Sequence, residues 1–537
     1  MITKRVKAFT TAWLAVLSIF QTTYGNSLEP DSDPIPLSIE SAVLMALDNN
    51  PDLRVEAFEP LIAGTFVQRE RAQFYPALFA ELSQREIRSS ETARATGEQF
   101  DAEIEQMLLQ GGIEQRFSPG TDVTLSIGQS AESSNRAPDQ DEASITLSFT
   151  QALLQGAGRT VNLAAIEKAE LDLEISQSEL RGYIETLVAN VERAYWQYWL
   201  AQETIEIASQ ALDVAQKQLE DLREQIAVGQ IASNEEAIAL AERARRRQTL
   251  IDARAEARKR RIELLAYIAP QQLGSIYTPT SLPEPPHDEV ETSIEERIAL
   301  AKVSRSDLQE AQMRLEQRNL DTVVTRNGRM PRLDFFAELG KIGYGSSTSD
   351  AWSDLSGSGY DVQAGIRLHY TPGRSADRAR ELEATFRQEQ AEAAIQNLRF
   401  QIDSRVRTAR YELQRAIQQI EASAETLLHQ QRTVDAEVER FQVGTGTALL
   451  VAQAQRDLLS VRIAEKEAQV QARFALLDLY LAEGSLLERR GFAMDQSDIE
   501  NHTQEYIMEY SREQGIIDSE GHGPDPFSKN GTVQENI

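Results

Sequence analysis

The chain has 537 residues, and its 84 acidic side chains outnumber its 55 basic ones, which gives a formal net charge of −29. This acidity argues against a nucleic-acid partner, because proteins that bind nucleic acid present a basic surface to the phosphates. The chain contains no cysteine. Disulfides, thiolate metal sites and an acylated N-terminal cysteine are therefore excluded.

The N-terminal segment has the pattern of a signal peptide. Basic residues within positions 4–7 precede an apolar run over residues 12–20, and Thr23-Tyr24-Gly25 is a passable cleavage site. The run is too short to cross a bilayer as a helix, which takes about 20 apolar residues. We predict a signal peptide over residues 1–25, with a retained anchor as the alternative. Beyond residue 25 the sequence offers no membrane helix, so any insertion would use β-strands.

The rest of the chain contains the same pattern twice. Early in each half, Ser38-Ile39-Glu40 returns as Ser293-Ile294-Glu295 at an offset of 255 residues, and later Val228-Gly229 returns as Val443-Gly444 at an offset of 215. The difference locates 40 additional residues in the first half. The duplication predicts a first repeat over residues 26–278, a linker over 279–290 and a second repeat over 291–490.

Each half begins with a predicted helix that ends at a proline. The first helix covers residues 38–75 and the second residues 293–330, and both begin at a serine, a good N-cap residue. Proline cannot continue a helix, and it favours extended geometry in the residue before it. We therefore predict helix-to-strand transitions at Pro76 and Pro331.

Strands follow each transition. In the second half they are predicted within residues 332–370, where apolar and polar side chains alternate from Tyr360 to Tyr370. In the first half they are predicted within residues 77–151. The additional 40 residues there include an inserted hairpin, with strands at 113–117 and 123–127 around a Ser-Pro-Gly turn.

Long helices are predicted after the strands, over residues 163–226 and 377–443. A turn and a shorter helix follow each of them, over residues 234–268 and 447–483. At about 1.5 Å per residue a long helix spans roughly 100 Å, and two of the shorter helices laid end to end match it. These lengths predict a coiled-coil rod with strands at one end and turns at the other. Residues 491–537 are acidic and polar and are predicted to be disordered.

The strands dictate oligomerisation if they enter a membrane. One chain cannot close a barrel alone, because the smallest membrane barrels have about 8 strands. An open sheet cannot expose unpaired edges to lipid. Three copies sharing one barrel would supply 12 strands, or 18 if the inserted hairpin joins. A small soluble β-domain at the end of the rod is the alternative.

The sequence contains no recognisable catalytic, metal-binding or cofactor-binding motif. The five histidines are scattered without a paired metal spacing, and no nucleophile elbow, Walker loop or dinucleotide fingerprint occurs. The densest aromatic cluster, Tyr195 to Trp199, lies within a predicted helix, where such a cluster packs between helices more often than it binds a ligand. The sequence therefore predicts no enzyme, no metal site and no cofactor.

Four segments point to one family. They are Leu37-Ser38-Ile39-Glu40-Ser41-Ala42-Val43, Asn50-Pro51-Asp52-Leu53, and the turns around Val228-Gly229 and Val443-Gly444-Thr445. Each motif is loose by itself, but their order and spacing over residues 37–490 are specific. In these features the chain resembles the TolC-like outer membrane efflux protein family.

The resemblance implies a mainly α fold with membrane β: an internally duplicated helix-strand-strand-helix-turn-helix chain. Three copies would share one outer-membrane β-barrel, continuous with a long periplasmic α-helical coiled-coil barrel. The function implied is a passive conduit in the outer membrane of a Gram-negative bacterium, serving tripartite efflux or type I secretion. Its partners would be outer-membrane lipid, an inner-membrane transporter and a periplasmic adaptor (membrane fusion protein), with drugs, metal ions and polypeptides all open as cargo.

The resemblance also places the periplasmic entrance, where the adaptor would dock, at Val228, Gly229, Val443, Gly444 and Thr445. Some members carry aspartate rings just past the second tip, but Leu450 and Gln453 stand at the matching positions here. Phe441 and Gly446 occupy positions where an aromatic and a basic gate residue are often found. A cation-binding aspartate ring is therefore not predicted.

One acidic gate position of the family is matched, by Glu235. The alternative to a gate role is that Glu235 is an acidic residue in the first turn of a helix, where the helix dipole favours a negative charge.

Two other functions stay open at this stage. A periplasmic adaptor also has a long helical hairpin, but it combines one hairpin with compact β-domains, whereas this chain has two hairpins and amphipathic strands. A structural protein that spans the periplasm would need neither a shared barrel nor glycines at the tips.

Overall fold

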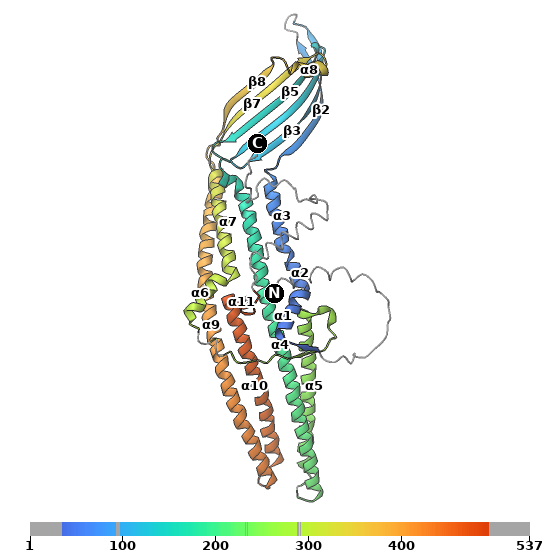
Figure 1. Cartoon of the computed structure of the whole chain (residues 1–537), viewed down its shortest axis with the longest axis vertical. Coiled ribbons are helices and arrows are strands. Elements are labelled where there is room, and N and C mark those ends of the chain that lie inside the picture. Colours follow the sequence, from blue (N-terminus) through green and yellow to red (C-terminus); the bar gives the residue numbers. More distant parts are fainter. Residues whose placement is uncertain are drawn as a thin grey trace, which may run out of the picture.

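The computed structural model describes residues 35–92, 97–230, 232–233, 235–286, 289 and 292–492. The predicted signal peptide and all but the first two residues of the predicted tail lie outside the described residues. The described chain is long and narrow, with a β-sheet at one end and the tips of two helical hairpins at the other (Figure 1).

Two long helices run from the sheet to the tips. They are α4 (Arg159–Ala227) and α9 (Ser375–Gln442), of 69 and 68 residues. At about 1.5 Å per residue each spans roughly 100 Å. α5 (Glu235–Ile268) lies along the tip half of α4, and α10 (Ala448–Glu483) along the tip half of α9 (Figure 1). Among the described residues, no helix combines the length and the apolar character needed to cross a membrane.

The single helix predicted over residues 38–75 is wrong: three helices occupy it. They are α1 (Ile39–Asn49), α2 (Pro51–Glu56) and α3 (Phe58–Ala72). Pro51 has no backbone N–H and holds Asn50 in extended geometry, with φ −69° and ψ 121°. The Asn50 side chain then caps α2 by accepting from the Leu53 N–H at 3.0 Å. The break is therefore visible in the sequence as Asn-Pro.

The single helix predicted over residues 293–330 is also wrong. α6 (Ile294–Ser304) and α7 (Ser306–Gly328) are separated by Arg305, which is extended at φ −71° and ψ 121°. No proline marks this break. Instead the Arg305 guanidinium pairs with Asp307 and donates to the Ala482 carbonyl oxygen at 3.1 Å, near the end of α10. A contact between distant parts of the chain stabilises the kink.

The sheet contains six antiparallel strands in the order β2-β3-β4-β5-β7-β8. Their bounds are β2 (Ala77–Thr92), β3 (Gln99–Phe117), β4 (Thr121–Ser134), β5 (Ala137–Ala152), β7 (Arg332–Gly345) and β8 (Tyr360–His369). The inserted hairpin of the first half is β3–β4, so it is part of the same sheet. Its strands are much longer than the five-residue segments that the sequence indicated at 113–117 and 123–127.

A short helix in the β7–β8 connection was not predicted. α8 (Thr348–Asp354) packs against β7 at Gly343 and Gly345, where a Cβ atom would collide with the α8 backbone. The glycines of this segment therefore allow a close approach of helix and strand, in addition to forming a loop.

The largest hydrophobic core lies midway along the rod, around α4. There β1 (Ile35–Leu37) pairs in parallel with β6 (Tyr277–Pro279), a two-stranded sheet that the sequence did not reveal. Tyr195 and Tyr198 of α4 are buried against these strands and hydrogen-bond to them. A 3₁₀ helix, η2 (Pro270–Gln272), leads into β6, and α11 (Leu486–Arg489) closes the described chain against α4. The aromatic cluster therefore packs, as its spacing predicted.

Candidate functional site

The first tip is the turn between α4 and α5. Gly229 has φ +78°, a left-handed conformation that glycine adopts without a steric penalty. Its N–H donates to the Ile226 carbonyl oxygen at 3.0 Å, and the Gln230 N–H donates to the Gln225 carbonyl oxygen at 2.9 Å. These paired bonds satisfy the last carbonyls of α4 and stop the helix.

The second tip repeats this geometry with equivalent residues. Gly444 has φ +79°. Its N–H donates to the Phe441 carbonyl oxygen at 3.0 Å, and the Thr445 N–H donates to the Arg440 carbonyl oxygen at 2.9 Å. Each of these residues lies 215 positions after its counterpart in the first tip. The duplication thus extends to individual hydrogen bonds.

Both tips expose valine at the end of the rod. Val228 is 70% exposed and Val443 is 74% exposed, and Leu449 and Leu450 are exposed beside the second tip. Exposed apolar side chains are therefore found at both tips.

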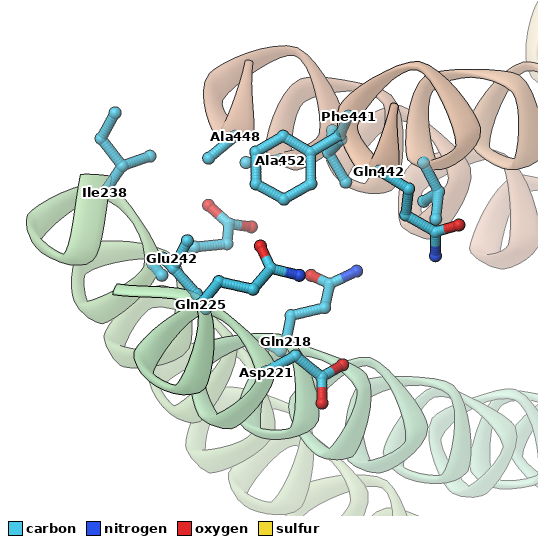
Figure 2. Close-up of a pocket in the computed structure, with 14 residues that line it drawn as sticks. Gln218, Asp221, Gln225, Ile238, Glu242, Phe441, Gln442, Ala448 and Ala452 are labelled. Atoms are coloured by element: carbon cyan, nitrogen blue, oxygen red, sulfur yellow. The ribbon is translucent and has the colours of Figure 1, made fainter. Parts of the chain in front are cut away.

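A space lies between the two hairpins near the tips (Figure 2). Gln225 and Glu242 stand on the α4–α5 side, and Phe441, Gln442 and Ala452 on the α9–α10 side. Glu242 forms a buried ion pair with Arg246 of the same helix, with 2.7 Å between nitrogen and oxygen. Burial lowers the pKa of Arg246, while the Glu242 carboxylate opposes that shift. This buried pair within one helix was not predicted from the sequence.

Glu235, the predicted gate acid, and the positions that depart from the family's gate residues lie near the two tips. Glu235 is in the first turn of α5, at the first tip. Leu450 and Gln453 are exposed on α10, about one helical turn apart. Gly446 lies in the second tip, where its N–H donates to the Arg440 carbonyl oxygen at 3.0 Å.

The predicted transition residues lie where helices meet the sheet. Pro76 and Pro331 each stand immediately before a strand, β2 and β7. Beside Pro331, the Asn327 side chain accepts from the Gly156 N–H at 2.7 Å, and the Gln155 N–H donates to the Pro331 carbonyl oxygen at 3.2 Å. These bonds join the two halves of the chain at the base of the sheet, and a lone asparagine near a helix end gave no signal of them.

The sheet has one apolar face and one polar face. The register places Leu78, Ile113, Leu125, Leu147, Leu339 and Val362 in one row across all six strands. Large exposed apolar side chains continue this face on every strand: Leu82, Met107, Leu109, Ile127, Ile145, Phe335, Tyr360, Ile366 and Leu368. We call this surface the apolar face.

The next row, one residue along each strand, points to the opposite side of the sheet. It consists of Ala77 at the edge followed by Glu114, Thr124, Ser148, Glu338 and Gln363. We call this side the polar face. In these two rows apolar and polar side chains are separated, although Phe79, Leu108 and Phe336 also lie on the polar side. The sheet thus has one mainly apolar surface and one mainly polar surface.

Comparisons with known proteins agree with this architecture. The family described as outer membrane efflux protein matches residues 43–269 and 298–485. No curated protein sequence matches the chain significantly.

Solved structures of outer-membrane channels have the same fold. The outer-membrane channel OprN matches with a TM-score of 0.62 at 17% identity, covering 83% of this chain and 90% of that one. The CmeC outer membrane channel of Campylobacter jejuni matches with a TM-score of 0.60 at 14% identity, covering 91% of this chain and 97% of that one. The outer membrane protein VceC of Vibrio cholerae gives 0.59 at 19% identity, covering 83% and 96%. With the family matched over most of the chain, this protein belongs to the outer membrane efflux protein family.

Proposed function

We propose that three copies of the chain form a passive conduit from the periplasm to the exterior, as the outer-membrane channel of a tripartite efflux or type I secretion system. The apolar face contacts outer-membrane lipid, the polar face lines the water-filled lumen, and the helices continue the conduit through the periplasm. The conduit carries no catalysis. The family assignment gives no support to the two alternative functions, a periplasmic adaptor and a structural protein that spans the periplasm.

The separation of the two faces of the sheet carries the proposal. A row of six apolar side chains across six strands, from Leu78 to Val362, is exposed in the part of the chain that the structure describes. Burying each such side chain is worth about 1.5–3 kcal/mol, so leaving them in water would be very costly. Lipid is the medium that removes this cost while leaving the polar face hydrated.

The two edges of the sheet support a closed ring of copies. β2 and β8 each pair with only one strand among the described residues. Because the sheet has an even number of strands, β8 of one copy runs antiparallel to β2 of the next. Their outward residues, Leu78 and Leu82 on β2 and Ile366 and Leu368 on β8, then continue one apolar surface. Closure by three copies removes every edge from lipid.

The tips support docking of a periplasmic adaptor, which links the conduit to an inner-membrane transporter. They present two equivalent turns per copy, each with an exposed valine beside a left-handed glycine. Six such turns around a threefold axis would meet a ring of adaptor hairpins. We also propose Glu235, in the first turn of α5, as an acidic residue of the closed entrance.

Ion conductance tests the proposal. We expect the purified full-length protein to extract only with detergent and to give discrete conductance steps in a planar lipid bilayer. A protein that stays soluble without detergent and gives no steps would overturn the conduit.

A matched pair of variants tests the assignment of the two faces. Leu147 and Ser148 are neighbours on β5, with Leu147 in the apolar row and Ser148 in the polar row. Leu147→Arg should prevent insertion, because an arginine facing lipid costs about 2–4 kcal/mol at the bilayer midplane. Ser148→Arg should insert and change only ion selectivity. Equal insertion of both variants would contradict the assignment.

A further inference from the structure

The hairpin β3–β4 has no counterpart in the second half of the chain. The second half contributes β7 and β8, and the first half contributes β2 and β5 as the equivalent strands plus this hairpin between them. Without it, three copies would supply four strands each. The hairpin is therefore the one large departure of the sheet from the internal duplication.

Both hairpin strands take part in the apolar row and in the polar row of the sheet. Ile113 and Leu125 stand in the apolar row, and Glu114 and Thr124 in the polar row. The hydrogen-bonded register runs without interruption from β2 through the hairpin to β5, apart from a bulge near Ser134 at the far end. The hairpin is thus a section of the sheet wall and does not fold over either face.

With the hairpin, the sheet of each copy is about as wide as the layer of helices that joins it. At the end near the sheet, each copy places four helices side by side, α3, α4, α7 and α9. Helix axes lie about 8–10 Å apart, so the four helices of one copy occupy roughly 38 Å of the circumference of the conduit. Strands lie about 4.8 Å apart and tilt about 40° in membrane barrels, so six occupy roughly 38 Å and four only about 25 Å.

The positions that β4 presents to the polar face are small, whereas β3 presents larger residues there, such as Gln110 and Glu114. The small positions on β4 include Thr124, Ser126, Gly128 and Ser130. Side chains of this size leave the lumen open. They contrast with the long polar residues on the polar face of β2, such as Glu81 and Arg85.

We propose that the β3–β4 hairpin is a pore-widening element, which makes the membrane end of the conduit as wide as its helical section. This inference rests on the proposed trimeric conduit. The barrel then has 18 strands, three copies of six. Because barrel diameter grows roughly linearly with strand number, the lumen is about 1.5 times as wide as that of a 12-strand barrel. Bulky cargo that passes the helices, such as a large organic molecule or an unfolded polypeptide, is not sieved at the membrane.

Deleting residues 97–136 tests the proposal in the full-length chain. The deletion removes β3 and β4 and leaves residues 93–96 to connect Thr92 of β2 to Ala137 of β5. These strands run antiparallel, and the new connection places Leu82 opposite Leu147, so the apolar sides stay on one face. Polyethylene glycols of graded size are added in a planar bilayer only on the side of the sheet, and the largest polymer that still lowers conductance is recorded.

We expect the polymer radius at exclusion to fall to about two thirds of the value for the unmodified chain. Addition from the sheet side makes this readout independent of a constriction at the tips. An unchanged exclusion radius would overturn the widening role while leaving the conduit intact. Absence of conductance from the unmodified chain would instead overturn the proposed function itself.

A pair of cysteine variants covers the case in which the deletion fails to fold. The chain has no native cysteine, so single cysteines report without background. Thr124→Cys should react with a charged, water-soluble methanethiosulfonate reagent and lower the conductance, whereas Leu125→Cys should be protected by lipid. Equal reactivity of the two positions would show that the hairpin is not part of the barrel wall and would overturn the proposal.

Discussion

The Tyr195 hydroxyl of α4 donates a hydrogen bond to the backbone carbonyl oxygen of Leu37, with 3.0 Å between the two oxygens. The same hydroxyl accepts from the N–H groups of Thr280 at 3.1 Å and Ser281 at 2.9 Å. One side chain thus joins the start of the first repeat, the linker after β6 and the longest helix. Tyr195 is fully buried, so water cannot replace these bonds.

Tyr195→Phe should therefore destabilise the middle of the rod. The Leu37 carbonyl keeps the Thr280 N–H as a donor at 3.0 Å, but the Ser281 N–H loses its acceptor. A backbone group left without its partner costs about 1–3 kcal/mol. We expect a lower midpoint of thermal unfolding in detergent, followed by helical circular dichroism, and faster proteolysis in the linker after Ser281. Tyr411→Phe is the control, because Tyr411 is largely exposed on α9. Equal midpoints for the two variants would show that the Tyr195 bonds contribute nothing.

Glu185 of α4 should make stability depend on pH. Its buried carboxylate accepts from the Leu486 N–H of α11 at 3.0 Å. Burial raises the pKa of Glu185 from 4.5 to about 7, against the lowering effects of the Leu486 hydrogen bond and of Arg181 and Arg305. The folded chain therefore holds this proton more tightly than the unfolded chain, and the associated stability is complete below pH 4.5 and is lost as the pH rises through 7.

Glu185→Gln removes this ionisation and can still accept from Leu486. Relative to the unmodified chain, the variant should gain stability between pH 5 and pH 8, by on the order of 3 kcal/mol in total. The measurement is the unfolding midpoint of both proteins in detergent across this range. Curves that stay parallel would contradict a raised pKa.

Glycine should be required at the two tips because of its left-handed backbone conformation, and not because a side chain would lack room there. A Cβ at Gly229 or Gly444 would meet no atom within 4 Å, but both residues have left-handed φ values. A β-branched residue is strongly disfavoured there, whereas asparagine is tolerated. Changing both glycines to valine should reshape the turns and weaken adaptor-dependent export, and changing both to asparagine should preserve it. Export would be followed by the sensitivity of a cell that relies on this channel, and undiminished export by the valine variant would exclude the tips as docking sites.

The ion pair between Glu192 and Arg490 should show an asymmetric response to mutation. Two guanidinium nitrogens of Arg490 each lie 2.6 Å from an oxygen of Glu192, which is fully buried on α4. Arg490→Leu leaves a buried carboxylate unpaired and should cost about 3–5 kcal/mol. The double variant Glu192→Leu, Arg490→Leu should recover most of that loss, as measured by thermal unfolding in detergent. A double variant no more stable than Arg490→Leu would show that hydrophobic replacement cannot substitute for the pair.

The repeats, the long helices and the two tips could be predicted from the sequence because their signals are local. A helix depends on residues three and four positions apart, and the alternation from Tyr360 to Tyr370 on residues two apart. The glycine after Val228 and after Val443 ends a helix through bonds within the same turn. The family resemblance rested on this ordered set of local signals, and the family match confirms it.

Two features were missed because they depend on contacts between residues far apart in the chain. The kink at Arg305 depends on a carbonyl of Ala482, and β1 forms only because Tyr277 lies beside Ile35, more than 200 positions later in the chain. The break at Pro51 is different, because Asn50-Pro51 was visible and local. Among the helix breaks that were missed, it is the one that neighbouring residues alone reveal.

The duplication, the alternation along the strands and the positions of the two turns follow from the chemistry of neighbouring residues, so they could be predicted from the sequence. That the inserted hairpin belongs to the sheet could be seen only in the folded chain. That membership depends on hydrogen bonds from β3 to β2 and from β4 to β5, which align Leu78 with Ile113 and Leu125 with Leu147 in one row. Strand alternation defines two faces, but only the pairing register brings the apolar faces of six strands onto one side of the sheet.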